Sequence, residues 1–228
     1  MLFAVSTMIA NDKLTPKGVR TRQGIVRLAA DLASAEGLEG LTVGGLATAL
    51  GMSKSGLFAH FGSKEALQLA VVDNAREQFE KRVFPASRKA RSGLPRLLTL
   101  LLAWCDHVEY AAHRGGCFFA AASAEFDDRP GPVRDEIARL TSLWLAHLTS
   151  EAVAAKSLGQ LRRKADPHQI GFELHAFVQE ANWAKRLHSH QDAFERARRA
   201  IRTCLYREAT AKGRRYLFPE PIDKDENP

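Results

Sequence analysis

Apolar residues recur with a helical period along most of the chain, and glycine, proline or short polar turns separate the periodic segments. Between residues 42 and 50, Val43, Leu46, Ala47 and Leu50 share one face of a helix with a period of about 3.6 residues. Comparable stripes run through most later segments. The pattern predicts an all-α fold.

Residues 42–61 predict two short helices joined by a tight turn. Thr42 can cap the first helix, because its hydroxyl can accept a hydrogen bond from an amide of the first turn. Gly51 stands where a helix often ends with a left-handed residue, and Ser53 can cap the second helix. The residues expected to anchor the second helix in the core are Leu57, Phe58 and Phe61.

The outer face of the second helix is small and polar and carries a cation. Its residues are Lys54, Ser55, Gly56 and His60. A short helix that is held by a partner helix and shows such a face fits the major groove of DNA. A solvated helix in an ordinary helical bundle is the alternative that this pattern leaves open.

The segment before this helix pair is basic. Its cations are Lys13, Lys17, Arg20, Arg22 and Arg27. They would make nonspecific contacts to phosphates, which add affinity without reading sequence, or they belong to a solvated arm. We expect residues 1–19 to form a flexible N-terminal arm.

After residue 62 the pattern predicts a helix that runs to about residue 82 and links two domains. A polar, proline-bounded stretch over residues 84–95 is expected to be a loop. Further helices are expected over residues 95–113, 117–128, 133–156, 166–188 and 192–211. The tail over residues 213–228 contains three prolines and scattered charge, so we expect it to be disordered.

Between residues 20 and 75 the chain reads, in order, a first helix TRQGIVRLAADLASAEG, the loop LEGLT, the turn GMS, the segment SKSGLFAHF, and SKEAL at the start of another helix. This ordered series resembles the DNA-binding region of tetracycline-repressor-type (TetR-family) transcriptional regulators. The residues that carry the resemblance are Gly51, Ser53, Gly56, Leu57, His60, Phe61, Lys64, Glu65 and Leu67.

The resemblance implies a helix-turn-helix DNA-binding domain over residues 20–66 and a helical effector-binding and dimerisation domain over residues 67–212. The implied DNA-binding residues are Thr42, Ser53, Lys54, Ser55, Gly56, Phe58, His60 and Lys64. Phe58 departs from the tyrosine that is more frequent in this family at that position. Gly44 and Gly45 would soften the first helix of the motif, since glycine costs about 1 kcal/mol against alanine inside a helix.

The last two helices resemble the family's dimer interface, in which they meet the same pair from a second copy. The seam residues expected there are Ile170, Leu174, Phe177, Ala181, Phe194, Ala197, Ile201 and Leu205. An intrachain pair is the alternative. A dimer would place two recognition helices in successive major grooves about 34 Å apart, so the DNA partner is expected to be an inverted repeat.

A small-molecule effector of unknown identity is expected in the second domain. Apolar walls with a few convergent polar groups are typical of such sites. The candidate lining residues are Trp104, His107, Cys117, Phe118, Phe126, Trp144, His147, Phe172 and His175. A helix start near Cys117 would favour its thiolate, which would allow a sensing role. Alternatively, Cys117 is a small buried apolar residue without a sensing role.

Net charge, apolar runs and cysteine number limit the classes of partner and site that the chain can have. The 228 residues carry a formal net charge of +7, which suits a polyanion, and no apolar run approaches the length of a membrane span. The three separated cysteines do not indicate a disulfide framework or a zinc site. Two pairs of residues could contribute to a metal site: His147 with Glu151, and His188 with His190. Neither pair has a further ligand nearby in the sequence, so we expect no metal and no cofactor.

No nucleophile elbow, phosphate-binding glycine loop or zinc-protease motif is present, so no catalytic residue is assigned and an enzyme is not expected. The sequence predicts a cytoplasmic, ligand-responsive repressor. Two alternatives stay open: a helical small-molecule or thiol-dependent enzyme or sensor, and a DNA-binding activator without a ligand. Turnover that survives alanine at Lys54 and His60 would identify the enzyme.

Overall fold

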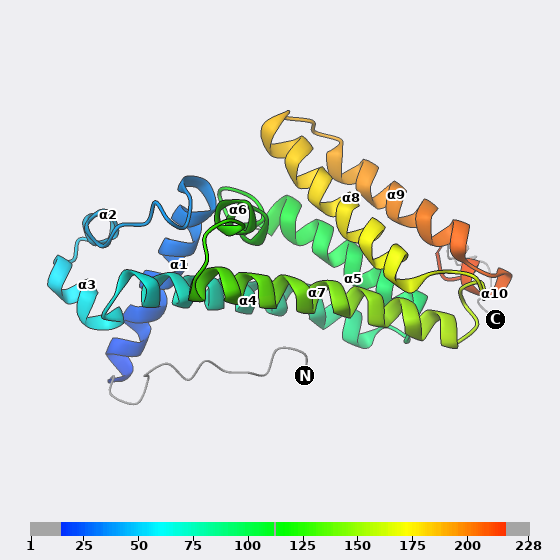
Figure 1. Ribbon diagram of the computed structural model, residues 1–228, viewed down its shortest axis with the longest axis horizontal. Helices are drawn as coiled ribbons and strands as arrows, with labels where there is room; N and C mark the ends of the chain where they lie inside the picture. Colours follow the sequence, from blue (N-terminus) through cyan, green and yellow to red (C-terminus); the bar gives the residue numbers. More distant parts are fainter. Residues whose placement is uncertain (1–14, 112, 218–228) are drawn as a thin grey trace, which may run out of the picture. The chain divides into compact units, whose positions relative to one another are not determined.

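The computed structural model describes residues 15–111 and 113–217 (Figure 1). Within these ranges the chain forms ten α-helices and one short π-helix, and it forms no β-sheet. The prediction of an all-α fold is therefore confirmed.

The helices follow one another with short connections. Their bounds are α1 (Pro16–Glu36), α2 (Val43–Ala49), α3 (Lys54–Phe61), α4 (Lys64–Lys89), α5 (Leu94–Asp106), the π-helix η1 (His107–Ala111), α6 (Phe118–Phe126), α7 (Pro132–Ser157), α8 (Pro167–Leu187), α9 (Ala193–Glu208) and α10 (Ala211–Arg214).

The chain divides into two compact units. Unit 1 comprises Met1–Lys81 and Tyr110–Leu143, and unit 2 comprises Arg82–Glu109 and Trp144–Pro228. Unit 1 therefore includes α6 and parts of α4 and α7 in addition to α1, α2 and α3. These units group residues by packing, whereas the ranges 20–66 and 67–212 divide them by role and stay predictions.

Unit 1 is built around alanines and aliphatic side chains. Ala29, Ala30 and Ala33 bring α1 close to its neighbours, and the side chain of Leu57 from α3 is fully buried in the same core. α6 contributes Phe118 to this core. Burying one leucine of this kind stabilises the fold by about 1.5–3 kcal/mol, so the core fixes α3 firmly.

Unit 2 contains α5, α8 and α9. α5 is apolar on most sides, as expected, and its Leu97, Leu100 and Leu101 are fully buried. α8 and α9 lie side by side as a helical hairpin (Figure 1). Asp166 caps α8 through its carboxylate, which accepts from the amide of His168, and Pro167 occupies the first turn.

The predicted loop over residues 84–95 is wrong for its first part, because α4 continues through Pro85 to Lys89. A proline inside a helix costs about 3 kcal/mol, since it removes one backbone hydrogen bond and crowds the preceding turn. Here Pro85 is exposed, while Val83, Phe84 and Ser87 are buried. The packing of these neighbours outweighs the cost of the proline.

Both predicted flexible ends require correction. α1 already begins at Pro16, and the hydroxyl of Thr15 caps it by accepting from the amide of Gly18, so residues 15–19 are not part of an arm. At the other end, Gly213 packs against the backbone carbonyl of Gln160 and Leu217 is fully buried, so residues 213–217 are not disordered. Residues 1–14 and 218–228 lie outside the described residues.

Two helix ends also differ from expectation. The α-helical geometry of α5 stops at Asp106, and the chain continues as the π-helix over His107–Ala111 instead of an α-helix to residue 113. α9 ends at Glu208, three residues before the predicted end. Periodicity does not distinguish a π-turn from an α-turn, which explains the first difference.

Candidate nucleic-acid interface and a buried polar cluster

α2 and α3 are capped as the sequence predicts. The hydroxyl of Thr42 accepts from the amide of Gly45 at 3.0 Å, and the hydroxyl of Ser53 accepts from the amide of Gly56 at 3.0 Å. Gly51 adopts a positive φ of 62° between the helices, a conformation that favours glycine. The two helices therefore form a helix-turn-helix with both starts fixed by side chains.

α3 has a buried side and an exposed side. Leu57 is fully buried and Phe61 packs against the core, whereas Phe58 is 49% exposed. The expectation that Phe58 anchors α3 is wrong, because it is one residue beyond Leu57 and about 100° further round the helix. Its exposure instead leaves it on the side expected to face DNA.

The other candidate DNA contacts lie on or next to α3. The side chains of Lys54 and Ser55 are exposed, Gly56 and His60 are half-buried, and the capping residues Thr42 and Ser53 are exposed at the helix starts. Lys54 also extends over α2, since a Cβ on Gly44 would lie 3.1 Å from its Cε. The structure therefore brings these seven candidates, Phe58 included, together around one short helix.

Lys64 is engaged with the loop between α1 and α2. Its Nζ donates to the Glu39 carbonyl at 2.6 Å and to Glu39 Oε1 at 2.8 Å. The hydrogen bonds from Lys64 and Gln68 hold the pKa of Glu39 below its usual value. A phosphate would have to compete with this carboxylate for the Lys64 ammonium group.

Sequence reasoning missed Glu125 of α6, which fixes the same loop. Its carboxylate accepts from the amide of Leu38 at 2.6 Å and from the amide of Glu39 at 3.0 Å. The preceding Gly37 has a φ of 89°, and a Cβ there would approach Glu125 Oε1 to 2.8 Å. Because the partners are more than 80 residues apart in sequence, no local pattern could reveal this contact.

The candidate effector residues fall into two groups. Cys117, Phe118 and Phe126 are buried in unit 1, and Phe118 and Phe126 are part of its hydrophobic core. Burial raises the pKa of the Cys117 thiol, which opposes the thiolate that a sensing role would need. The structure does not place these three residues in the same unit as the remaining candidates.

The second group forms an aromatic cluster in unit 2. The rings of Trp104 and Trp144 meet edge to face at 5.1 Å, and the ring of His175 lies 5.4 Å from that of Trp104. His147 joins through Phe84, a residue that sequence reasoning missed, at 5.3 Å between ring centroids. The cluster therefore unites four of the predicted residues. His107 lies in the π-helix of the same unit.

Phe172 does not belong to this interior. Its side chain is 63% exposed on α8, so the expectation that it lines an enclosed effector site is wrong. Its spacing from Ile170 and Leu174 places Phe172 on the opposite side of α8, a signal in the sequence that the expectation did not use.

The polar groups of the cluster are buried. His147 and Glu151, one turn apart on α7, are each only 8% exposed, and His147 Nδ1 and Glu151 Oε2 have no hydrogen-bond partner. Burial raises the pKa of Glu151, and it lowers the pKa of both His147 and His175. The nearest cation to Glu151 is Arg96, at 3.8 Å.

This arrangement could hydrogen-bond a ligand's polar group next to aromatic walls. No group of three metal-ligating side chains occurs in residues 15–111 and 113–217.

The predicted dimer residues lie on α8 and α9, which pack against each other and against α5 within a single chain. Phe177 is half-buried, and the remaining seven are buried: Ile170, Leu174, Ala181, Phe194, Ala197, Ile201 and Leu205. A second copy could not reach the buried seven in this conformation. The large apolar side chains that these helices expose are instead Phe172, Trp183, Leu187 and Tyr206.

Comparison with known proteins tests the resemblance that the sequence showed. Residues 25–71 match the model of bacterial regulatory proteins of the tetR family, and residues 93–201 match the model of a tetracyclin repressor-like C-terminal domain. No curated protein matches the chain significantly. Among the described helices, none combines the length and the apolar content that a membrane span requires.

Several solved structures share the fold. A TetR transcriptional regulator from Chloroflexus aurantiacus is similar with a TM-score of 0.79 and 23% identity, covering 86% of this chain and 98% of that one. A TetR-family regulator from Cytophaga hutchinsonii gives 0.75 and 20%, covering 87% and 99%. AibR in complex with isovaleryl coenzyme A and operator DNA gives 0.64 and 21%, covering 79% and 95%.

Proposed function

Because this chain belongs to the tetR family of bacterial transcriptional regulators, we propose that it is a cytoplasmic, ligand-responsive repressor that binds an inverted-repeat operator as a homodimer. The observation that carries the proposal is α3, a capped helix with a fully buried Leu57 on one side and exposed Lys54 and Ser55 on the other. No enzymatic activity is proposed.

The proposed division of labour follows the chemistry of α3. Ser55, Gly56 and His60 would approach base edges in the major groove, where donor and acceptor patterns distinguish all four base pairs. Lys54, near the start of the helix, would contact phosphate. These contacts require α3 to be held rigidly. The hydrogen bonds of Glu125 and Lys64 to the loop between α1 and α2 support this rigidity.

The exposed stripe of α8 supports homodimerisation. Phe172, Trp183 and Leu187 are separated by eleven and four residues, so they share one face of the helix, and each is at least 63% exposed. Large apolar side chains gathered on one exposed face are typical of protein interfaces. In our proposal this face contacts the same face of a second copy of the chain. The buried residues of α8 and α9 then stabilise the packing within each protomer.

The buried polar cluster of unit 2 supports an effector. The structure of AibR with isovaleryl coenzyme A and operator DNA provides a relative of the same fold in which a small molecule and DNA are both present. A predominantly apolar effector with one hydrogen-bonding group would suit Trp104, Trp144 and His147. It can shift the protein between DNA-bound and free states only by its differential affinity for the two.

Two substitutions separate the proposed roles on α3 and α4. Lys64→Ala should weaken binding to all duplexes about equally and flatten the salt dependence, because it removes one phosphate contact. Ser55→Ala should change the preference among sequences. Equal effects of both on every sequence would contradict the assignment.

The control for Lys64 is its partner. Glu39→Gln removes the ion pair but keeps the Lys64 charge. If Lys64 contacts phosphate, Glu39→Gln should leave the salt dependence intact. If Lys64 acts only by holding the loop, both variants should weaken binding with the same salt dependence.

A further inference from the structure

Unit 1 contains a groove that the DNA interface and the aromatic cluster of unit 2 do not use. It has a volume of about 560 Å³ and is lined by α1, by the first part of α4 and by the start of α7. Its volume falls within the range of about 300–1,000 Å³ that is usual for small-molecule sites. The residues that carry the argument are Arg22, Val26, Leu69, Ala70 and Asn74.

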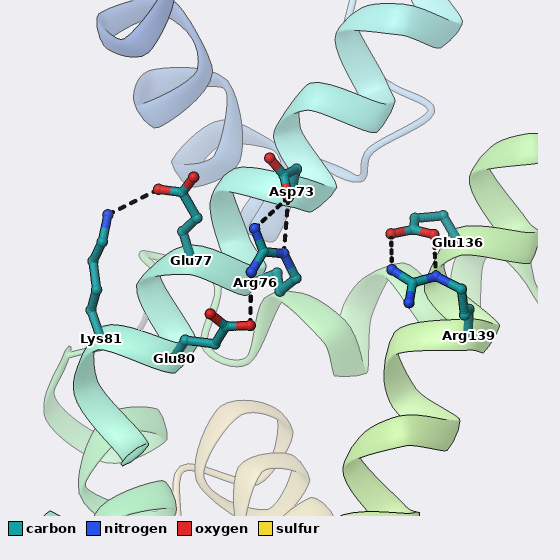
Figure 2. Close-up of polar contacts among 7 residues, drawn as sticks. All are labelled: Asp73, Arg76, Glu77, Glu80, Lys81, Glu136 and Arg139. Atoms are coloured by element: carbon teal, nitrogen blue, oxygen red, sulfur yellow. Dashed lines mark hydrogen bonds and ion pairs between the residues drawn. The ribbon is translucent and has the colours of Figure 1, made fainter. Parts of the chain in front are cut away.

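The charges of the α4 wall are paired with one another (Figure 2). Arg76 donates to Asp73 at 2.7 and 2.9 Å and to Glu80 at 2.7 Å, and Lys81 donates to Glu77 at 2.9 Å. Each of these contacts joins residues three or four positions apart on one helix. Each carboxylate of this wall is therefore bonded to a cation, but Asp73 and Glu80 share Arg76, so the wall keeps one net negative charge.

The α7 wall is neutralised separately. Arg139 forms a bidentate pair with Glu136, with both distances at 2.7 Å, and Figure 2 shows this pair apart from the α4 group. The cations of these pairs, Arg76, Lys81 and Arg139, are all engaged by carboxylates, so neither wall offers them free to an anionic ligand. The selectivity of the groove must then come from the remaining side, which is α1.

Two cations of α1 line the groove, Arg22 and Arg27. Arg27 is exposed and donates to the Gln23 carbonyl, which leaves Arg22 as the partly buried cation. The Arg22 guanidinium is half-buried and lies 4.6 Å above the ring of Phe61, and it makes no ion pair with any residue in 15–111 or 113–217. Burial lowers the pKa of Arg22, and the field of Asp73 opposes this shift. A partly desolvated guanidinium without a carboxylate partner is a favourable position for an anion, because its planar fork matches a carboxylate.

The rest of the groove supplies a floor and an amide. Val26 is buried, and Leu69 and Ala70 are half-buried, so the floor is apolar. The side-chain oxygen of Asn74 is buried and has no hydrogen-bond partner. Buried polar atoms are normally paired, so this orphan atom is a second, independent sign that a ligand completes the site.

We propose that this groove binds a small organic carboxylate, with the anionic group on Arg22, the apolar body on Val26, Leu69 and Ala70, and a polar substituent at Asn74. The site differs from the proposed effector site in unit 2. Binding to the free chain does not depend on the proposed function, so the two can fail separately.

The position of Arg22 couples this site to the recognition helix. Phe61 is the last residue of α3, and Arg22 covers its ring. A carboxylate that draws the guanidinium into the groove weakens this cation–π contact. Occupancy of the groove should therefore be visible at the end of α3 as well as at α1 and α4.

The test is amide-detected NMR of the full chain, without DNA, titrated with benzoate, phenylacetate and hydrocinnamate and with their neutral carboxamides. Ligands of about ten heavy atoms should bind with dissociation constants on the order of millimolar. We expect the carboxylates, and not the amides, to shift the resonances of Arg22, Leu69, Asn74 and Phe61.

Variants locate the binding. Arg22→Gln should weaken carboxylate binding about tenfold, which is the loss expected for one charge-assisted pair. Ala70→Leu keeps every charge but fills the apolar floor of the groove, so it should abolish the resonance shifts that the carboxylates cause. Arg163→Gln removes a positive charge from the exposed connector between α7 and α8 and should change nothing.

Three results would overturn the proposal: amides that bind as well as carboxylates, Arg22→Gln that binds as well as the parent, or carboxylate shifts confined to unit 2. Because the assay contains no DNA, a negative result would leave the repressor proposal untouched. Failure of DNA binding would likewise leave this site untouched.

Discussion

Two sets of buried polar groups, one around the end of α1 in unit 1 and one in the aromatic cluster of unit 2, differ in their hydrogen bonding. In unit 1, the buried Gln68 donates to the Leu38 carbonyl at 3.1 Å and to Glu39 at 2.9 Å, and the buried Ser34 donates to the Asp31 carbonyl and accepts from the amide of Gly115. In unit 2, the buried His147 and Glu151 each keep an atom without a hydrogen-bond partner.

The difference indicates different tasks. The paired groups of Ser34 and Gln68 fix the end of α1 and the following loop beside the alanine-rich core, and a rigid support of this kind is what a DNA-reading helix needs. An unpaired buried polar atom costs about 1–3 kcal/mol, so the aromatic cluster of unit 2, with His147 and Glu151, is not optimised for stability. Groups that remain unpaired in the free protein are available to a ligand, which supports the proposed effector site.

The most disruptive test of the frame is Leu57→Ala. Removing a fully buried leucine side chain should lower the free energy of unfolding by about 2–5 kcal/mol, through lost burial and a cavity, and should abolish DNA binding. Urea denaturation measures the loss. The control is Phe58→Ala, which should cost less than about 1 kcal/mol because the side chain is half exposed.

A smaller loss is expected from Glu125→Ala. The substitution leaves the amides of Leu38 and Glu39 without their acceptor, which should cost about 2–3 kcal/mol for these charge-assisted hydrogen bonds. Hydrogen exchange should show faster exchange at both amides. Asp127→Ala, at an exposed neighbour, serves as control, and unchanged protection at Leu38 and Glu39 in the Glu125 variant would contradict the account.

The buried histidines of the aromatic cluster predict that the free energy of unfolding depends on pH. Burial lowers the pKa of His147 and His175 below 6.5, so the unfolded chain binds protons more readily, and stability should be lost as the pH falls below that value. The raised pKa of Glu151 acts in the opposite direction, stabilising the folded state as the pH falls through it.

Comparison with a variant isolates the histidines. In His147→Gln/His175→Gln the loss of stability between pH 7 and pH 5 should be smaller than in the parent, as measured by urea denaturation at each pH. Glu151 is common to both chains, so its effect on the comparison largely cancels. Identical pH profiles would show that the interior does not hold these histidines neutral.

The smallest expected effect on stability comes from a glycine substitution in α2. Gly44 lies in its first turn, and a Cβ there would meet only the flexible end of Lys54 at 3.1 Å. Gly44→Ala should therefore raise the free energy of unfolding by about 0.5 kcal/mol. Gly51→Ala should instead lower it by about 1 kcal/mol, because the φ of Gly51 is 62°.

The features visible in the sequence are local. The caps formed by Thr42 and Ser53, the turn at Gly51 and the burial of Leu57 all follow from residues within one or two helical turns. They were enough to predict the helix-turn-helix and most helices. Phe58 shows the limit, since composition marked it as an anchor while its angular position left it exposed.

The features that the sequence could not reveal depend on tertiary packing. Glu125 reaches a loop more than 80 residues away, and the packing around Pro85 keeps a helix intact that the proline alone would end. Likewise, the apolar seam of α8 was visible, but only the structure shows that α9 of the same chain covers it while Trp183 stays exposed.

The most direct test of the central claim is selection of bound sequences from a random duplex pool at near-physiological salt, followed by footprinting of the enriched duplex. We predict an inverted repeat with half-sites about one helical turn apart, and loss of its binding in Lys54→Ala/His60→Ala. No enriched sequence, with binding that vanishes uniformly as salt rises, would show only a basic helical protein and would contradict the assignment of α3 as a recognition helix.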